Sequence, residues 1–238
     1  NGSLEWSSAM KDQEKLIESV NELQSYPKYT PTSVIGHKKA KKLEPHINFK
    51  GNENIIFSKA DGAINPKDAI SKMIDVIKKN GGSVLYPCKF ERIIESNDSF
   101  SKVKTSMGIL KSENVIFCNG VDVDNSFNVN FLKKPRPGVI IKTKPQKNLI
   151  NSVVYGPKIH AHQQSNGQII IGEQITAPIK ENSTDHLKRI NKHFKNMIKS
   201  ASNLNPSEVL IGWRPIPKDD LPIIGRFKNK SVYIAVMH

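Results

Sequence analysis

The sequence predicts a mixed α/β (α+β) protein, and the order of its helix and strand signals is what predicts it. A helix with clear start and end signals spans residues 66–79, and short strands follow it at once. From about Pro137 onward strand signals dominate, and a single helical pattern interrupts them. This grouping is typical of a small mixed part joined to an antiparallel sheet.

Two helices are expected within the first 60 residues. Residues 11–24 repeat apolar side chains at helical spacing, and residues 36–43 make a short basic helix. The second helix ends at Glu44-Pro45, because the residue before a proline is disfavoured in the helical conformation. The apolar face of the first helix carries Leu16, Val20 and Leu23.

The helix over residues 66–79 has the clearest end signals in the chain. Asn65 is a capping residue, and Pro66 suits the first helical position. Asp68 suits the positive end of the helix dipole, and Asn80-Gly81-Gly82 ends the helix. Its apolar stripe consists of Ala69, Ile70, Met73, Ile74 and Ile77.

Strands are expected in two groups. The first group covers residues 84–86, 90–95, 102–106, 109–111 and 115–118. The second covers residues 139–142, 152–155, 158–164, 168–174, 209–214 and 232–236, with one helix that carries Leu187, Ile190, Phe194 and Met197. Ser165-Asn166-Gly167 is expected to join two of these strands as a hairpin.

Composition excludes several classes of protein. No apolar run approaches the ~20 residues that a membrane-spanning helix needs, and the N-terminus has no apolar signal-peptide core. Two cysteines cannot form a disulfide framework, so a reducing compartment is expected. Membrane-spanning, fibrous and cystine-rich classes are therefore excluded, and we expect a cytoplasmic location.

The net charge of +14 raises the question of a nucleic-acid partner. Only five of the 36 basic residues are arginine, which phosphate and base-edge recognition favour, and aromatic residues make up 7%. Nucleic acid is therefore not expected as the primary partner. The alternative is a non-catalytic basic interaction domain for nucleic acid or an acidic partner, whose binding would weaken steeply with salt.

The segment Gly212-Trp213-Arg214-Pro215 places an arginine at the end of a strand. A guanidinium held by a proline-fixed turn can bind a carboxylate through two parallel hydrogen bonds. The structural alternative is that Arg214 binds backbone carbonyls and ties down the proline-rich corner. Spacing alone leaves both open.

His160 and His162 share one face of a strand, because side chains alternate along it. Such a pair can bind a metal together with His186 or His193, but acidic and cysteine ligands are not close in sequence. No metal is therefore expected. The pair is expected to line a pocket wall, and the alternative is two partly exposed strand histidines.

Two further segments are candidates for contact with a ligand. An apolar strand ends in the tight turn Cys118-Asn119-Gly120, where the backbone can approach a ligand closely. Cys88 follows Pro87 between two strands, where a lone cysteine is more often a small buried apolar residue than a nucleophile. GxSxG, Walker A, CxxC, HExxH and GxGxxG motifs are absent, so hydrolysis has no residues to support it.

In order along the chain, six segments resemble the D-amino-acid oxidase superfamily of FAD-dependent oxidoreductases, in particular its glycine oxidase and sarcosine oxidase branch. The most specific is residues 212–225, which is similar to the family motif G-x-R-P-x-x-x-D-x-x-P-x-I-G. The other segments are Gly2-Ser3-Leu4, Leu43-Glu44-Pro45, residues 61–66, residues 115–120 and residues 168–172.

The resemblance implies part of an FAD-binding dinucleotide domain plus an antiparallel-sheet substrate-binding domain. Residues 1–60 would be a helical segment leading into the substrate domain, and residues 61–135 the remainder of the FAD-binding domain. Residues 136–210 would be the substrate domain, and residues 211–238 the return to the FAD-binding domain. FAD is the implied cofactor: hydride passes from an amine or amino acid to the flavin, and the imine then hydrolyses.

The resemblance also implies the site residues. Arg214 would bind the substrate carboxylate, with His160 and His162 as further substrate-binding residues. The implied cofactor-binding residues are Cys88, Cys118, Asn119, Gly120, Gly225 and His238. No catalytic residue is assigned, because the flavin performs the redox step. A small amino acid or amine is the expected partner, and a homo-oligomer, a protein electron acceptor and a quinone stay open.

The sequence departs from the family pattern at both ends. The GxGxxG segment does not occur, and in the family a glycine-rich turn and a flavin-facing helix follow the position of Met237-His238. We therefore expect an internal fragment that by itself binds FAD weakly or not at all. His160 stands where the family often has tyrosine, which leaves the exact substrate open.

Overall fold

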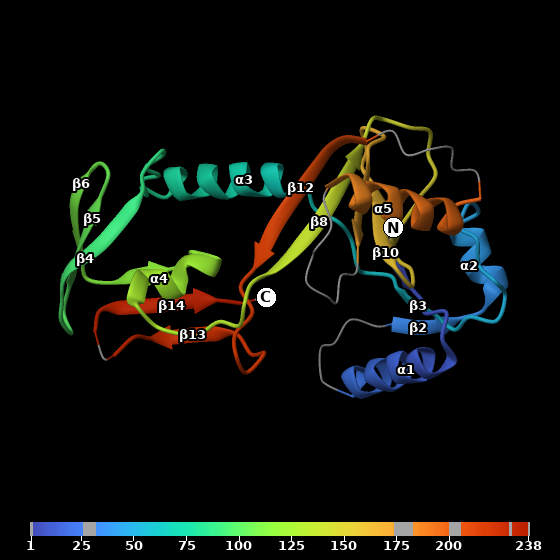
Figure 1. Cartoon of the computed structure of the whole chain (residues 1–238), viewed down its shortest axis with the longest axis horizontal. Helices are drawn as coiled ribbons and strands as arrows, with labels where there is room; N and C mark the ends of the chain where they lie inside the picture. Colours follow the sequence, from blue (N-terminus) through green and yellow to red (C-terminus); the bar gives the residue numbers. More distant parts are fainter. Residues whose placement is uncertain (1, 26–31, 174–182, 200–205, 229, 238) are drawn as a thin grey trace. The chain divides into compact units, whose positions relative to one another are not determined.

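The computed structural model describes residues 2–25, 32–173, 183–199, 206–228 and 230–237, which form two compact units (Figure 1). Unit 1 comprises residues 1–64 and 138–212, and unit 2 comprises residues 65–137 and 213–238. Each unit is thus built from two separate stretches of the chain. Both contain helices and strands, which confirms the mixed α/β class.

Unit 1 is built on an eight-stranded sheet with the order β12-β8-β11-β10-β9-β1-β3-β2. The N-terminal strand β1 pairs parallel with β9 and antiparallel with β3, so it joins the two parts of the sheet. The strands are β1 (Ser3–Glu5), β2 (Thr32–Ile35), β3 (Ile55–Ser58), β8 (Arg136–Thr143), β9 (Val153–Tyr155), β10 (Ile159–Gln163), β11 (Ile169–Glu173) and β12 (Pro206–Arg214).

The expected strands from β8 to β12 are confirmed with small changes at their ends, and residue 174 lies outside the described residues. The predicted hairpin joins β10 and β11, and its turn is closed by a bond from the Gly167 N–H to the Gln164 carbonyl (2.9 Å). The sequence signals missed β1, β2 and β3. Each has only three or four residues, too few to show the alternation of a strand.

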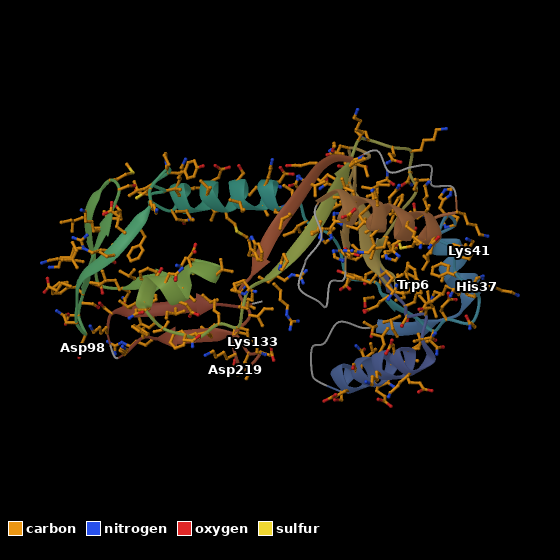
Figure 2. The ribbon with its side chains drawn as sticks, in the orientation of Figure 1. Trp6, His37, Lys41, Asp98, Lys133 and Asp219 are labelled. Carbon is orange, nitrogen blue, oxygen red and sulfur yellow. The ribbon has the colours of Figure 1, made fainter. Side chains whose placement is uncertain are left out.

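The helices of unit 1 are α1 (Met10–Gln24), α2 (His37–Leu43) and α5 (Ser183–Met197), and the sequence predicted all three. Figure 2 shows His37 and Lys41 on α2, where the Lys41 ammonium donates to the carbonyl of Ile47 (2.5 Å). Glu44 follows α2 directly as its C-cap, as expected from the Glu44-Pro45 stop signal.

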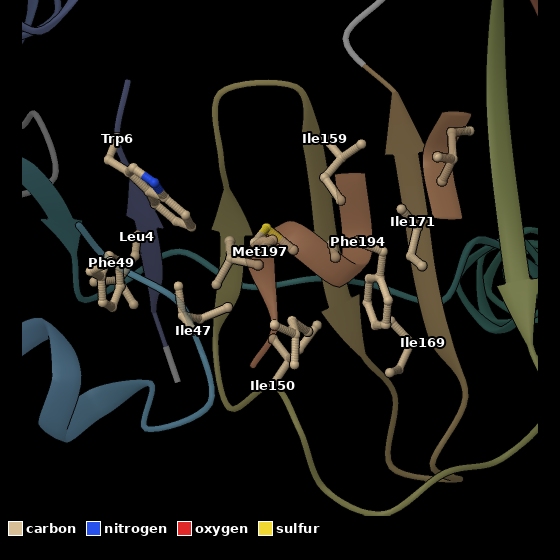
Figure 3. Packing of buried hydrophobic residues seen from close by; sticks show 14 of the residues in the cluster. Leu4, Trp6, Ile47, Phe49, Ile150, Ile159, Ile169, Ile171, Phe194 and Met197 are labelled. Atoms are coloured by element: carbon tan, nitrogen blue, oxygen red, sulfur yellow. The ribbon is translucent and has the colours of Figure 1, made fainter. Parts of the chain in front are cut away.

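One hydrophobic core holds unit 1 together (Figure 3). Phe194 and Ile190 of α5 are 1% and 0% exposed, and they belong to the same buried cluster as Ile171 of β11. Trp6 and Phe49 extend this cluster, with their rings edge to face at 5.1 Å. The apolar face predicted for α5 is therefore the face that covers the sheet.

Unit 2 contains two three-stranded sheets, in the orders β13-β14-β7 and β4-β5-β6. Strand β7 runs parallel to β14, so both strands end at the same edge of their sheet. The elements are α3 (Pro66–Lys79), β4 (Phe90–Ser96), β5 (Ser101–Thr105), β6 (Gly108–Ser112), β7 (Val115–Phe117), η1 (Gly120–Asp122), α4 (Val123–Phe127), β13 (Ile223–Arg226) and β14 (Val232–Val236).

Phenylalanine rings join the parts of unit 2. Phe117 of β7 lies between Phe90 of β4 and Phe127 of α4, with ring centroids 4.8 Å and 4.7 Å away. Phe227 contacts Phe127 in turn, at 4.7 Å. These edge-to-face and tilted contacts tie the meander and the parallel strands into one unit.

Helix α3 begins as predicted, since the Asn65 Oδ1 accepts the N–H of Lys67 at 3.0 Å. All of its residues are described and none is buried: Ala69 and Ile74 are partly covered, while Ile70, Met73 and Ile77 of the apolar stripe are exposed. The predicted strand at residues 84–86 is wrong, because an apolar run becomes a strand only where a partner strand pairs with it, and none does among the described residues. The sequence also missed β13, which follows a proline-rich corner.

Within the described ranges, no helix combines the length and apolarity needed to cross a bilayer.

Candidate functional site

His160 lies in the middle of the unit 1 sheet, between Tyr155 of β9 and Gly172 of β11. A Cβ atom at Gly172 would lie 2.1 Å from the His160 Nε2, so the imidazole occupies space that only a glycine leaves free. On the other side, the rings of His160 and Tyr155 lie 5.8 Å apart. The two neighbouring strands therefore fix the position of this ring.

Acidic groups adjoin this pair of rings. Glu5 of β1 is in register with Tyr155, so Glu5, Tyr155 and His160 form one row across three strands. Burial, and then the charge of Asp61, raises the pKa of Glu5. Burial also raises the pKa of Tyr155, with further contributions from Asp61 and Glu5. Asp61 in turn accepts a hydrogen bond from the Ser3 hydroxyl at 2.6 Å.

The sequence does not predict Glu5, Asp61 and Tyr155 as neighbours of His160. Asp61 only begins one of the segments that carry the family resemblance, and Tyr155 only ends a predicted strand. The pairing of β1 with β9 is what brings them together, and no local motif encodes that pairing. The family pattern often has a tyrosine at the position where this chain has His160. In this chain a tyrosine, Tyr155, lies next to that position on the neighbouring strand.

His162 shares the face of His160 two residues further along β10 and is half-buried. Burial lowers its pKa. His186 lies on α5, where its Nδ1 is 2.8 Å from a guanidinium nitrogen of Arg189. Arg189 also donates to the buried Glu173 at 2.5 Å and 2.8 Å. In the described part of the chain, no three potential metal ligands gather.

Arg214 is the last residue of β12 and belongs to unit 2. It is partly buried, and no hydrogen bond or ion pair joins its guanidinium to any described residue. The two histidines belong to unit 1, so the predicted substrate-binding residues are divided between the two units.

The turn after β7 brings the predicted cofactor-binding residues Cys118, Asn119 and Gly120 together. Cys118 is exposed. The Asn119 Nδ2 donates to the Ser126 hydroxyl at 2.9 Å, while its Oδ1 is buried without a hydrogen-bond partner among the described residues. Gly120 has a positive φ of 58°, and its only close neighbour in the described structure is Pro215, 3.9 Å from where a Cβ would lie.

Folding thus places the turn after β7 next to the proline that follows Arg214, although the two segments are far apart in the chain. The remaining predicted cofactor residues lie apart from this turn in sequence. Gly225 pairs with Ile234 in the β13–β14 ladder. Cys88 is partly buried in the connection between α3 and β4. His238 lies outside the described residues.

Comparison with known proteins agrees with the resemblance seen in the sequence. The family model described as FAD dependent oxidoreductase (DAO) matches residues 1–238. No curated protein sequence matches the chain.

Solved structures share the fold at low sequence identity. L-proline dehydrogenase from P. horikoshii is 20% identical with a TM-score of 0.86, and the match covers 99% of this chain and 66% of that one. Glycine oxidase from Geobacillus kaustophilus is 15% identical with a TM-score of 0.85, and the match covers 100% and 65%. L-amino acid deaminase from Proteus vulgaris, with its specific insertion deleted, is 18% identical with a TM-score of 0.82, covering 99% and 63%.

The chain therefore spans slightly less than two thirds of the length of these structures. The family match, by contrast, extends over its whole length. The chain belongs to the DAO family of FAD-dependent oxidoreductases, whose cofactor is FAD.

Proposed function

We propose that this protein oxidises a small amino acid or amine, with FAD as the hydride acceptor. The observation that carries the proposal is Arg214, a partly buried guanidinium that no acidic group among the described residues neutralises. A substrate carboxylate would bind such a fork through two charge-assisted hydrogen bonds. The structural neighbours support this class, since their names refer to L-proline, glycine and L-amino acids, which all carry a carboxylate.

The turn after β7 fits the cofactor. The Asn119 Oδ1 is a buried acceptor without a described partner, and a hydroxyl group of the FAD ribityl or ribose could donate to it. Gly120 leaves the adjacent space open for a close approach of the backbone. Cys118, Asn119 and Gly120 would therefore hold the cofactor, together with Cys88 and Gly225. When bound, FAD supplies the redox chemistry by accepting hydride from the substrate carbon.

In unit 1, we assign contacts with the substrate to His160 and His162. Both present their side chains on one sheet face, and Gly172 keeps the His160 ring in a fixed position. Glu5 and Asp61 give this face an acidic character within a chain of net charge +14. A carboxylate pair of this kind favours the protonated amino group of an amine substrate over an uncharged group.

The test compares two substrates that differ in one group, glycine and methylamine, with the flavin-loaded full-length enzyme. Anaerobic bleaching of the flavin spectrum by an amino acid or amine from a wider panel identifies the substrate class first. The Arg214→Ala variant should then raise KM for the carboxylate substrate by about 30-fold to about 900-fold, equivalent to about 2–4 kcal/mol. The amine without a carboxylate should be unaffected.

Arg136→Ala is the matched control, because Arg136 is an exposed arginine of unit 2. An unchanged KM for the carboxylate substrate in Arg214→Ala would rule out the carboxylate fork. A holoenzyme whose flavin no amino acid or amine reduces would show that the proposed substrate class is wrong.

A further inference from the structure

Unit 1 contains a cavity of about 480 Å³ beside the C-terminal end of α5. It uses none of the residues assigned above to the substrate or to FAD. Its lining combines an apolar floor with a rim of basic side chains. The lining residues are Trp6, Ser8, Asn48, Lys50, Glu53, Gly156, Pro157, Lys158, Ile159, His193, Lys195, Asn196 and Met197.

The floor of the cavity is formed by Trp6, Ile159 and Met197, which are 5%, 2% and 7% exposed (Figure 3). Gly156 allows them to pack closely. A Cβ atom at this position would lie 3.2 Å from both the Met197 Sδ and the Trp6 Cζ2. The floor is therefore preformed, with an indole ring and a thioether at its base.

The rim is built from two turns that hydrogen bonds hold in shape. A backbone hydrogen bond of 2.9 Å between the first and last residues closes the turn at residues 156–159, which presents Lys158. In the second turn, at residues 50–53, the carboxylate of Glu53 accepts hydrogen bonds from the backbone N–H groups of Lys50 (2.7 Å) and Gly51 (2.8 Å). Both oxygens of Glu53 are thus engaged within its own turn.

Lys50, Lys158 and Lys195 are three exposed lysines that line the cavity at this rim. Throughout the described ranges, none of the three forms an ion pair with a carboxylate. Among the described residues of the lining, Glu53 alone is acidic, and it is buried and bonded to backbone N–H groups. The cavity therefore has an excess of positive charge above an apolar floor.

His193 also lines the cavity. Burial lowers its pKa most, the charge of Glu173 raises it, and Lys158, Arg189 and Lys192 lower it. An anion placed in the cavity would relieve the repulsion among the lysines of the rim.

We propose that this cavity is a second ligand site, which binds a small organic anion. The apolar body of the ligand would lie on Trp6 and Met197, and its carboxylate or phosphate group would lie between the lysines of the rim. The volume suits a small metabolite, and the combination of an apolar base with a few convergent polar groups is typical of ligand pockets. The proposal rests on unit 1 alone and is independent of the oxidase chemistry.

Tryptophan fluorescence tests the site directly. The chain has two tryptophans, so the Trp213→Phe variant leaves Trp6, in the floor of the cavity, as the only reporter. The probes are phenyl phosphate, phenylacetate, inorganic phosphate and the neutral 2-phenylethanol. The two aromatic anions should change the Trp6 emission saturably, and the neutral alcohol should not at the same concentrations. The aromatic anion that binds more tightly identifies the preferred anionic group. Competition by inorganic phosphate shows whether a phosphate group binds the site without an apolar body.

The lysines provide the mutational test. Replacing Lys158 and Lys195 together by alanine should weaken binding of the aromatic anion about tenfold or more, since each lysine contributes a charge-assisted contact. Raising the salt concentration from about 0.02 M to about 0.5 M should also weaken it, because ions screen the rim. The matched control is the Lys38→Ala, Lys42→Ala double variant, whose lysines lie on the exposed side of α2.

Arg214→Ala, in the same Trp213→Phe background, separates this site from the substrate site. Binding that this variant abolishes would belong to the substrate site and would overturn the proposal. The absence of any saturable change in Trp6 emission with both aromatic anions would also overturn it. So would an affinity that the Lys158 and Lys195 substitutions leave unchanged, provided that thermal unfolding shows both variants to be folded.

Discussion

The carboxylate of Glu44 connects α2 to the residues that precede β9, and its removal tests how unit 1 is held together. Glu44 is 0% exposed. Its oxygens accept the backbone N–H of Asn151 at 3.0 Å and 3.1 Å and the backbone N–H of Ser152 at 2.5 Å. The substitution Glu44→Ala deletes both acceptors and leaves the buried Ser152 N–H without its partner.

The expected loss of stability follows from these contacts. Hydrogen bonds to a charged group contribute about 1.5–3 kcal/mol each, so two donors give a gross loss of about 3–6 kcal/mol. Relief from burying a carboxylate offsets part of this loss. Asn151 is also exposed, so water can replace its lost partner. We expect Glu44→Ala to lower the free energy of unfolding by about 2–4 kcal/mol.

The pH dependence has a defined sign. Burial raises the pKa of Glu44, and the bonds from Asn151 and Ser152 and the charge of His46 oppose this only in part. The pKa of Glu44 is higher in the folded state than in the unfolded state. Its contribution to the free energy of unfolding is therefore complete below the unfolded-state pKa and is lost as the pH rises through the folded-state pKa. The difference in stability between the wild type and Glu44→Ala should therefore grow as the pH falls from about 7 toward about 4.

Urea unfolding in the Trp213→Phe background measures this loss, because Trp6 then reports on unit 1 alone. Glu14→Ala is the matched control, since Glu14 is an exposed glutamate of α1. A loss below about 1 kcal/mol would refute the role given to the buried carboxylate. A difference that shrinks on acidification would refute the reasoning about its pKa.

Two further predictions concern the unit 1 sheet. Gly172→Ala should displace the His160 ring, because the new Cβ would lie 2.1 Å from it, and should lower the free energy of unfolding in urea by about 1–3 kcal/mol. The control Gly212→Ala should cost less, because a Cβ there meets no described atom within 4 Å. Equal losses in the two variants would contradict the steric argument. Arg189→Leu should cost about 3–5 kcal/mol because it leaves the charge of Glu173, whose side chain is 8% exposed, without its guanidinium partner and with only His186 beside it among the described residues, at 3.7 Å. The double variant with Glu173→Leu should recover much of that loss, and no recovery would show that packing rather than charge is responsible.

The local signals in the sequence account for most of the secondary structure. Helix α3 begins at the predicted cap because the Asn65 side chain bonds to a backbone N–H two residues away, which needs no tertiary contact. The hairpin of β10 and β11 was predictable for the same reason, since its turn lies between adjacent strands. Residues 84–86 have an equally apolar sequence but form no strand, because among the described residues they lack a partner to pair with.

The resemblance in the sequence identified the family, and it selected the turn after β7 and Arg214 as candidate site residues. It could not show that the Asn119 Oδ1 is buried without a described partner, because that depends on the residues folded around it. Nor could it show whether an acidic residue pairs with Arg214. Both properties depend on residues that are distant in the chain.

What the sequence by itself determined is the set of elements whose signals are local: the caps, the helical stripes, the tight turns and the family motifs. Only the tertiary structure decided which side chains meet. Glu5 reaches Tyr155 and His160 because β1 pairs with β9, and Trp6 meets Met197 because α5 packs over the same sheet. The physical reason is that strand register and core packing depend on the shape and hydrogen bonding of the whole unit, which no short stretch of the chain encodes.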